Sequence, residues 1–390
     1  MPIINRLAEY QDEVAAWRHD LHQHPEILYD VHRTAAKVAE RLQEFGVDEV
    51  VTGLGRTGVV GVIRGKRGDN GRTVALRADM DALPLTEITG KPYASTVPGK
   101  MHACGHDGHT AMLLGAAKYL AETRNFDGTA VVIFQPAEEG GGGGKAMIDD
   151  GLMERFGIDE VYGMHNMPGL DIGKFAIRPG PIMASTDEFN FTIKGRGAHA
   201  AKPHMSLDPI VIGSHLVQAM QTIVSRSVDP LESVVVSVTK FHAGEAHNII
   251  PQTAYLGGTV RTLTPEMRDL AEKRIREIAA GIAATYGAEI EVDYDRNYPV
   301  TVNHAANTSF AADVASEIVG ADRVERETAP MMGGEDFSYM LEKRPGAFIF
   351  IGNGDTAGLH NPAYDFNDDA LPIGASYWVR VVETSLAPPA

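Results

Sequence analysis

This chain of 390 residues has one cysteine, an excess of acidic over basic residues, and no run of 18 apolar residues. The single cysteine, Cys104, excludes an internal disulfide framework and is typical of a reducing compartment. The 35 lysine and arginine residues are outnumbered by 52 acidic ones, which gives a formal net charge of −17. Nucleic acid and anionic membrane surfaces would repel such a molecule, so we expect neither as a partner.

The sequence also lacks a segment that would direct or anchor the chain. Residues 1–6 lead into polar helical sequence, without the charged start and apolar core of a secretory signal. A membrane-spanning helix would need about 18 or more consecutive apolar residues. We therefore expect a soluble cytoplasmic protein, and the 44% hydrophobic content predicts a sizeable core in two domains or one large one.

Short apolar segments alternate with helical ones over much of the chain, which predicts an α/β fold with a mostly parallel sheet. The expected strands are 58–63, 73–77, 129–134, 161–165 and 347–351, and the expected helices are 111–124, 144–153 and 306–319. Such sheets place ligands beyond the carboxyl ends of their strands. Acidic and histidine residues stand at or after these ends, namely Asp79, Asp81, Glu138, Glu139, His165 and His360.

The pattern of expected strands and helices changes between residues 183 and 299. The expected order there is β-α-β-β-α-β, the order of a ferredoxin-like unit. Pro179–Pro181 and Asn297–Pro299 flank this segment as hinges. Sheet-type sequence resumes afterwards, so the smaller domain interrupts the larger one. We predict a catalytic metal-binding domain at 1–182 and 300–390, and an inserted lid or dimerisation domain at 183–299.

Cys104 lies in the segment Met101–Thr110, with His106 two residues on, and an apolar helical run follows. A thiolate beside imidazoles suits a soft divalent metal. A Cys/His nucleophile pair or a cysteine that merely packs in the core would fit the same ten residues. The acidic and histidine residues at the other strand ends favour the metal hypothesis.

Glu138 and Glu139 are adjacent at a strand end, so their side chains should diverge. One could reach a metal while the other addresses water, which is the division of labour in metal-assisted hydrolysis. Lowering the pKa of water from about 15.7 to about 7 is worth roughly 12 kcal/mol at about 1.36 kcal/mol per unit. The following run, Gly140–Gly144, does not match a P-loop, and we expect it to crowd against the metal site.

Five motifs together resemble the amidohydrolase branch of the M20 metallopeptidase family, which includes hippurate hydrolases, N-acyl-amino-acid amidohydrolases and plant auxin-conjugate hydrolases. They occur in the family's order and span nearly the whole chain. The motifs are Ala78–Pro84 (ADMDALP), His102–His109 (HACGHDGH), Gln135–Glu139 (QPAEE), Gly195–Ala200 (GRGAHA) and Gly333–Phe337 (GGEDF).

The resemblance implies a site for two divalent ions, Zn²⁺ or Mn²⁺, with Ni²⁺ or Co²⁺ also compatible with the donors. It implies Glu138 as the general base and Asp81 as the aspartate that orients the site. In the peptidase members a histidine ligand stands where this chain has Asp79, and the Cys104 loop replaces a bridging aspartate. His102 and His109 are expected to pack or to support the ligands. The implied ligands are Cys104, His106, Glu139, His165 and His360.

The resemblance further implies hydrolysis of N-acyl amino acids to a carboxylic acid and a free amino acid. His199 resembles a histidine that reaches the partner subunit's active site and stabilises the oxyanion, which implies a homodimer. Asn248 and Arg261 resemble the pair that holds the substrate carboxylate, for which a guanidinium is well shaped. A metallo-dipeptidase, a cysteine-dependent hydrolase and a non-catalytic binding protein are the alternatives.

Overall fold

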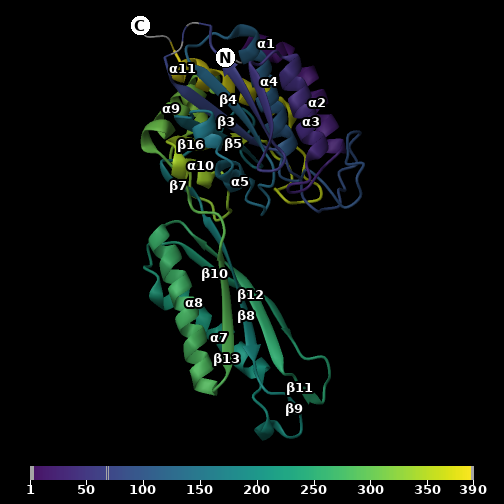
Figure 1. Cartoon of the computed structure of the whole chain (residues 1–390), viewed down its shortest axis with the longest axis vertical. Coiled ribbons are helices and arrows are strands. Elements are labelled where there is room, and N and C mark those ends of the chain that lie inside the picture. The colour runs from purple at the N-terminus through teal and green to yellow at the C-terminus, as the bar shows by residue number, and fades with distance from the viewer. Residues whose placement is uncertain (1–3, 67, 69, 388–390) are drawn as a thin grey trace. The chain divides into compact units, whose positions relative to one another are not determined.

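The computed structural model describes residues 4–66, 68 and 70–387, which form two compact units (Figure 1). Unit 1 comprises the chain up to Ile182, Val302–Ala329 and the chain from Asp336; unit 2 comprises Met183–Thr301 and Pro330–Glu335. The chain leaves unit 1 at β7 (Gly180–Met183) and returns at β14 (Thr301–Asn303). The domain roles expected from the sequence, catalysis for one and a lid or dimer contact for the other, stay predictions.

An eight-stranded sheet with the order β1-β2-β4-β3-β5-β16-β6-β15 forms the centre of unit 1. The central pairs β4–β3, β3–β5 and β5–β16 are parallel, which confirms the predicted α/β class. Every residue of β3 and β16 is buried, as is typical of strands covered on both faces. The strands are β1 (Glu49–Leu54), β2 (Gly58–Arg64), β3 (Thr73–Asp79), β4 (Thr129–Gln135), β5 (Glu160–Met167), β6 (Phe175–Ala176), β15 (Val324–Glu325) and β16 (Gly346–Gly352).

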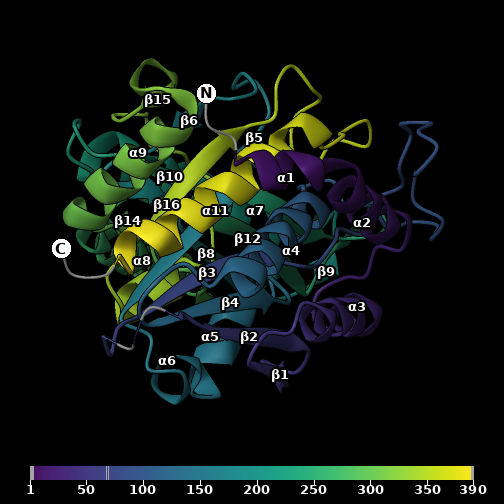
Figure 2. The same ribbon diagram turned by 90° about the horizontal axis from the view of Figure 1, so that it is seen from above.

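Helices cover this sheet. Helix α4 packs on β3 and against α2 and α11, and Figure 2 shows α4 and α11 side by side over the sheet. Helix α3 packs on β1 and β2, α9 on β16, and α5 on β4. No helix in the described ranges has the length and apolar composition needed to cross a membrane. The helices are α1 (Asn5–Glu9), α2 (Gln11–Gln23), α3 (His32–Glu44), α4 (His106–Thr123), α5 (Gly143–Asp149), α6 (Leu152–Arg155), α9 (Ala305–Val319), η3 (Ala321–Arg323), α10 (Ser338–Lys343), η4 (Asp368–Ala370) and α11 (Leu371–Ser385).

Helix α4 begins at His106, five residues before the start predicted from the apolar run at 111. The residue before it, Gly105, has φ +88° and turns the chain into the helix. A Cβ atom there would lie 2.2 Å from Asn166 Nδ2, so only glycine fits this turn. The earlier start places the first turn of α4, with its histidines, inside the protein.

Unit 2 has a four-stranded antiparallel sheet in the order β10-β12-β8-β13, with α7 and α8 packed against it. Alternate residues of β8 are buried, and Phe189, Phe191 and Ile193 contribute to a core with the two helices. The chain order is β-α-β-β-α-β, that of a ferredoxin-like unit. The elements are β8 (Ser185–Lys194), β9 (Ala198–His199), η1 (Pro203–Met205), α7 (Pro209–Thr222), η2 (Ile223–Ser227), β10 (Val234–Ala243), β11 (Ile249–Ile250), β12 (Thr253–Thr262), α8 (Pro265–Tyr286) and β13 (Glu289–Arg296).

Candidate metal centre

The carboxyl ends of β3, β4 and β5 meet at one edge of the unit 1 sheet, because these strands are parallel neighbours. Strand β3 ends at Asp79, β4 leads into Glu138 and Glu139, and β5 carries His165 near its end. The first turn of α4 lies beside them. The sheet therefore brings together side chains that are up to 86 positions apart in the sequence.

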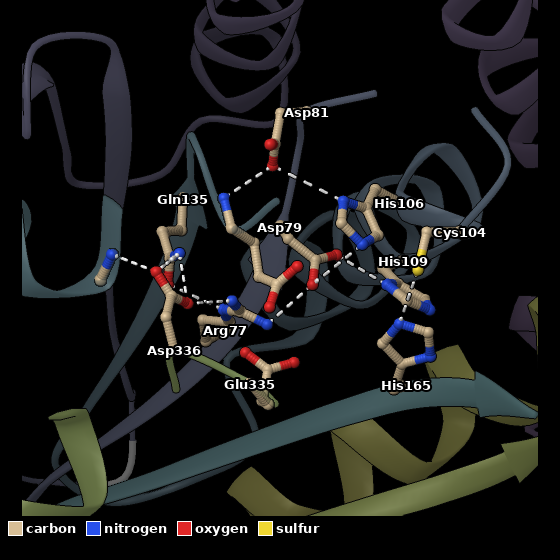
Figure 3. A network of polar contacts seen from close by, with 12 residues as sticks. Arg77, Asp79, Asp81, Cys104, His106, His109, Gln135, His165, Glu335 and Asp336 are labelled. Carbon is tan, nitrogen blue, oxygen red and sulfur yellow. Dashed lines mark hydrogen bonds and ion pairs between the residues drawn. The ribbon is translucent and has the colours of Figure 1, made fainter. Parts of the chain in front are cut away.

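Cys104, His106 and His165 form one buried group whose donor atoms all lie within 4.8 Å of one another. The Cys104 Sγ atom is 3.3 Å from His165 Nε2 (Figure 3). Two donors bound to the same ion at about 2.0–2.3 Å are separated by at most about 4.6 Å. This group is therefore compact enough, after small side-chain adjustments, to hold one ion through sulfur and nitrogen.

Cys104, Glu139 and His360 form a second such group, which shares Cys104 with the first. His360 Nε2 lies 3.2 Å from Glu139 Oε1, and the His360 side chain is 55% exposed. His106 connects the groups, because its Nε2 lies 4.0 Å from the same glutamate oxygen. All five ligands implied by the sequence thus lie in two adjoining sets.

The charges of this region fit a cation. Burial alone would lower the pKa of His106, but the carboxylates of Asp79, Asp81 and Glu139 outweigh it and raise the pKa to about 10. Neither ring nitrogen of His106 has a hydrogen-bond partner among the described residues. The carboxylates favour a positive charge at this buried ring, which has no hydrogen bond within the described ranges, so they would equally favour a metal ion bound to the neutral imidazole in place of the ring proton.

Glu138 and Glu139 follow a turn in which Ala137 is fully buried and has φ +54°, a conformation unusual for alanine. The Asp81 carboxylate accepts the backbone N–H of Glu138 at 2.9 Å and that of Glu139 at 3.1 Å. Glu138 is 7% exposed, and its carboxylate lies within 4.8 Å of donor atoms of His106 and Glu139. The candidate base therefore borders the ligand groups.

The glycine run after these glutamates packs against the turn that precedes them, whereas the sequence predicted that it would crowd against the metal site. A Cβ atom on Gly143 would lie 1.7 Å from the carbonyl oxygen of Pro136, two residues before Glu138. The Gly144 N–H donates to Asp336 Oδ2 at 2.8 Å. The run thus supports the turn that carries the two glutamates, which is a structural reason for glycine there.

The three remaining predicted residues lie in unit 2. His199 in β9 pairs with Ile249 of β11, and the Ala200 N–H donates to the Asn248 carbonyl at 3.0 Å, so His199 and Asn248 are neighbours. Arg261 lies near the C-terminal end of β12, whereas β11 precedes the start of this strand at Thr253. The eight residues from Thr253 to Arg261 span roughly 26 Å in an extended strand. Within one chain, the structure does not bring Arg261 together with the other two.

Arg77 and Asp336, for which the sequence pattern predicts no role, are buried beside the candidate centre. The Arg77 guanidinium donates to Asp79 Oδ2 at 2.8 Å and to Asp336 Oδ1 at 2.9 Å. The sequence does contain a signal for Arg77, because an arginine inside an otherwise apolar strand needs hydrogen-bond acceptors that are buried with it. Its partners could not be identified because they depend on which strands are neighbours.

Residues 75–384 match the family described as peptidase family M20/M25/M40, and the chain belongs to this family. The hippurate hydrolase of Campylobacter jejuni is 46% identical over 381 residues, covering 98% of this chain and 98% of its own. The N-acetylcysteine deacetylase of Bacillus subtilis is 39% identical, covering 93% of this chain and 94% of its own. These matches confirm the predicted family and a hydrolase of amide bonds.

A solved structure agrees with the fold. The YXEP protein of Bacillus subtilis, a dinuclear metal binding peptidase of the M20 family, has a TM-score of 0.83 and 34% identity, covering 97% of this chain and 99% of its own. The family and the two donor groups together support divalent metal ions in this chain.

Proposed function

We propose that this chain is a metal-dependent amidohydrolase that cleaves N-acyl amino acids, of the hippurate or N-acetyl-amino-acid type, to a carboxylic acid and a free amino acid. The observation that carries the proposal is the pair of donor groups that share Cys104, with the Glu138 carboxylate at their border. The names of the relatives support the substrate class, since two of them act on hippurate and on N-acetylcysteine.

The ligand sets would hold two divalent ions, with Cys104, His106 and His165 in one set and Glu139 and His360 completing the other. Zn²⁺ and Mn²⁺ are the favoured ions, and Ni²⁺ or Co²⁺ also suit a mixture of sulfur, nitrogen and oxygen donors. Ions bound there would acidify water and polarise the amide carbonyl.

Glu138 takes the proton of the attacking water and returns it to the leaving nitrogen, the work of a general base that becomes a general acid. Asp81 accepts the backbone N–H of Glu138 and so fixes the part of the main chain that carries this carboxylate. Two adjacent glutamates on one turn can then serve different roles, because successive side chains diverge.

Substrate binding in this proposal needs two copies of the chain. Asn248 and Arg261 lie at opposite ends of the unit 2 sheet, so one subunit does not supply both to a single carboxylate. A homodimer solves this if Arg261 serves its own subunit's site while His199 and Asn248 serve the site of the partner. His199 would there stabilise the oxyanion, and the guanidinium would bind the carboxylate.

One observation favours a cysteine hydrolase instead. His165 Nδ1 donates to the Asn166 carbonyl at 2.7 Å, so its unprotonated Nε2 faces Cys104 Sγ as a base would. However, burial raises the pKa of the Cys104 thiol well above its ordinary value, and the charges of Glu139 and Glu138 act in the same direction. A reactive cysteine needs the opposite shift from its protein surroundings, whereas a bound metal ion would itself deprotonate the thiol, so the metal proposal explains the site better.

Removal of metal by a chelator distinguishes the metal-dependent amidohydrolase from the cysteine hydrolase. The purified protein is analysed for metals, treated with EDTA, and assayed on hippurate, N-acetyl amino acids and dipeptides before and after Mn²⁺ or Zn²⁺ is restored. We expect about two ions per chain, loss of activity with EDTA, recovery with metal, and no requirement for a free amino group. Full activity after complete metal removal would refute the proposal in favour of the cysteine hydrolase.

A further inference from the structure

His109, in the first turn of α4, is 2% exposed and forms hydrogen bonds through both ring nitrogens. Nδ1 lies 2.6 Å from Asp79 Oδ1 (Figure 3), and Nε2 lies 2.9 Å from the backbone nitrogen of Asn166. A backbone N–H can only donate, so Nε2 must be the acceptor and the ring proton must be on Nδ1. The imidazole therefore donates to Asp79 and accepts from Asn166.

The Asp79 end of this connection is fixed by Arg77. The guanidinium donates to Asp79 Oδ2 at 2.8 Å, to Asp336 Oδ1 at 2.9 Å and to Gln135 Oε1 at 2.9 Å. All four side chains are 0–1% exposed, so solvent does not weaken these bonds. Both oxygens of Asp79 are thus occupied, one by Arg77 and the other by His109.

The Asn166 end is joined to the segments that carry two candidate ligands. Asn166 directly follows His165, and its Nδ2 donates to the carbonyl oxygen of Cys104 at 2.6 Å. Its Oδ1 accepts the hydroxyl of Tyr364 at 2.7 Å. A displacement of Asn166 would therefore move the backbone at both Cys104 and His165.

Proximity alone would allow a different role for His109. Donor atoms of Asp79, His106 and His109 lie within 4.8 Å of one another, which is compact enough for a metal ion. Such an ion would have to displace the hydrogen bonds at Asp79 and His109. It would also lie close to the positive charge of Arg77, which opposes a second cation.

We propose that His109 is a positioning residue and not a metal ligand: it connects the Arg77–Asp79 pair to Asn166 and thereby fixes the segments of Cys104 and His165. This inference rests on the proposed function, because the segments it fixes are those of the candidate ligands. Residues that hold ligands in this way typically change metal affinity by about 10- to 100-fold when they are replaced.

The test compares His109→Leu with His109→Gln by chelator competition, elemental analysis and kcat. We expect His109→Leu to bind metal about 10- to 100-fold more weakly, to reach the wild-type number of ions at saturating metal, and to have a lower kcat. His109→Gln should restore most of the affinity, because an amide can donate to Asp79 and accept from Asn166. Unchanged affinity in His109→Leu, equal weakening in both variants, or loss of one ion from both at saturating metal would each overturn the inference.

Asn303→Leu is the matched control. Asn303 is 2% exposed, and its side chain forms hydrogen bonds with the backbones of Arg178 and Phe348, neither of which is a candidate ligand. Its loss should lower stability in urea without changing metal affinity. If the wild-type protein keeps full activity without metal, the proposed function is wrong. If wild-type activity depends on metal and His109→Leu has the wild-type metal affinity, only the proposed role of His109 is wrong.

Nitrogen-15 NMR of histidine rings in the Zn²⁺-loaded wild-type protein gives a readout that needs only the wild-type fold. The His109 signals are identified by their absence from the His109→Gln spectrum. We expect a protonated Nδ1 and an unprotonated, metal-free Nε2. A metal-bound or unprotonated Nδ1 would overturn the inference.

Discussion

The Asp81 carboxylate accepts the backbone N–H of Glu138 at 2.9 Å, so the orientation of the candidate base is set through its main chain. The same carboxylate accepts the N–H of Glu139 at 3.1 Å, and its Oδ1 lies 3.6 Å from His106 Nδ1. One buried aspartate therefore contacts the backbone of the candidate base Glu138 and two candidate ligands, Glu139 and His106. Because Asp81 lies two residues after the end of β3, the sheet positions its carboxylate beside these residues.

Asp81→Asn should impair catalysis more than folding. The amide nitrogen that replaces one oxygen cannot accept a backbone N–H, so the turn loses one of its two supports. A buried donor left without a partner costs about 1–3 kcal/mol, and we expect kcat to fall by about 10- to 100-fold. Kinetics with a urea unfolding curve check this, and wild-type kcat in the variant would show that Asp81 does not orient the base.

Gly143→Ala should destabilise the protein and reduce activity. The added Cβ would meet the Pro136 carbonyl at 1.7 Å and force the turn before Glu138 to move. Overpacking of this kind costs about 1–3 kcal/mol. Urea unfolding and kcat measure both effects, and an alanine variant as stable and active as wild type would contradict the close packing.

Gly281→Ala is the matched control for that substitution. Gly281 lies inside α8, and nothing lies within 4 Å of its added Cβ atom. Alanine should stabilise the helix by about 0.5–1 kcal/mol and leave kcat unchanged. A loss of stability at this position would mean that glycine replacement is harmful for reasons other than crowding.

The parts of the fold that follow local patterns were predicted from the sequence, and the parts that depend on neighbours were not. The parallel strands and the ferredoxin-like order follow from apolar periodicity, and the convergence of Cys104, Glu139 and His165 follows from the shared edge of parallel strands. The start of α4 at His106 was missed, because the apolar run begins later and Gly105 alone marks the turn. The roles of Arg77 and His109 depend on the β4-β3-β5 order, which no local pattern specifies.

Stability should fall in alkaline solution because of His22, a buried histidine of α2. Burial alone would lower its pKa, but the carboxylates of Asp107 at 2.8 Å and Glu87 at 3.3 Å outweigh it and raise the pKa to about 9. The ordinary value is about 6.5. The charged ring therefore stabilises the folded state fully below about pH 6.5, and this contribution is lost as the pH rises through about 9.

Urea unfolding of wild type and His22→Gln between pH 6 and pH 10 checks this. The wild-type protein should be more stable near pH 6, and the difference in free energy of unfolding should shrink towards pH 10. A difference that stays constant over this range would show that the His22 charge does not contribute.

Mixing two inactive variants tests the shared site. His199→Ala and Arg261→Ala should each be inactive, because each removes one residue from every site of a homodimer. After subunit exchange, mixed dimers would contain one intact site if His199 acts on the partner, which predicts about a quarter of wild-type activity in an equal mixture. No recovery despite demonstrated subunit exchange would mean that one chain supplies both His199 and Arg261 to the same site.

The most direct test of the metal-dependent mechanism is the kcat and metal content of Glu138→Gln. The amide keeps the shape of the carboxylate but cannot take a proton from water. We expect the variant to bind the same number of ions as wild type and to lose at least about 100-fold in kcat. A metal-replete variant with near-normal kcat would contradict the assignment of Glu138 as the general base.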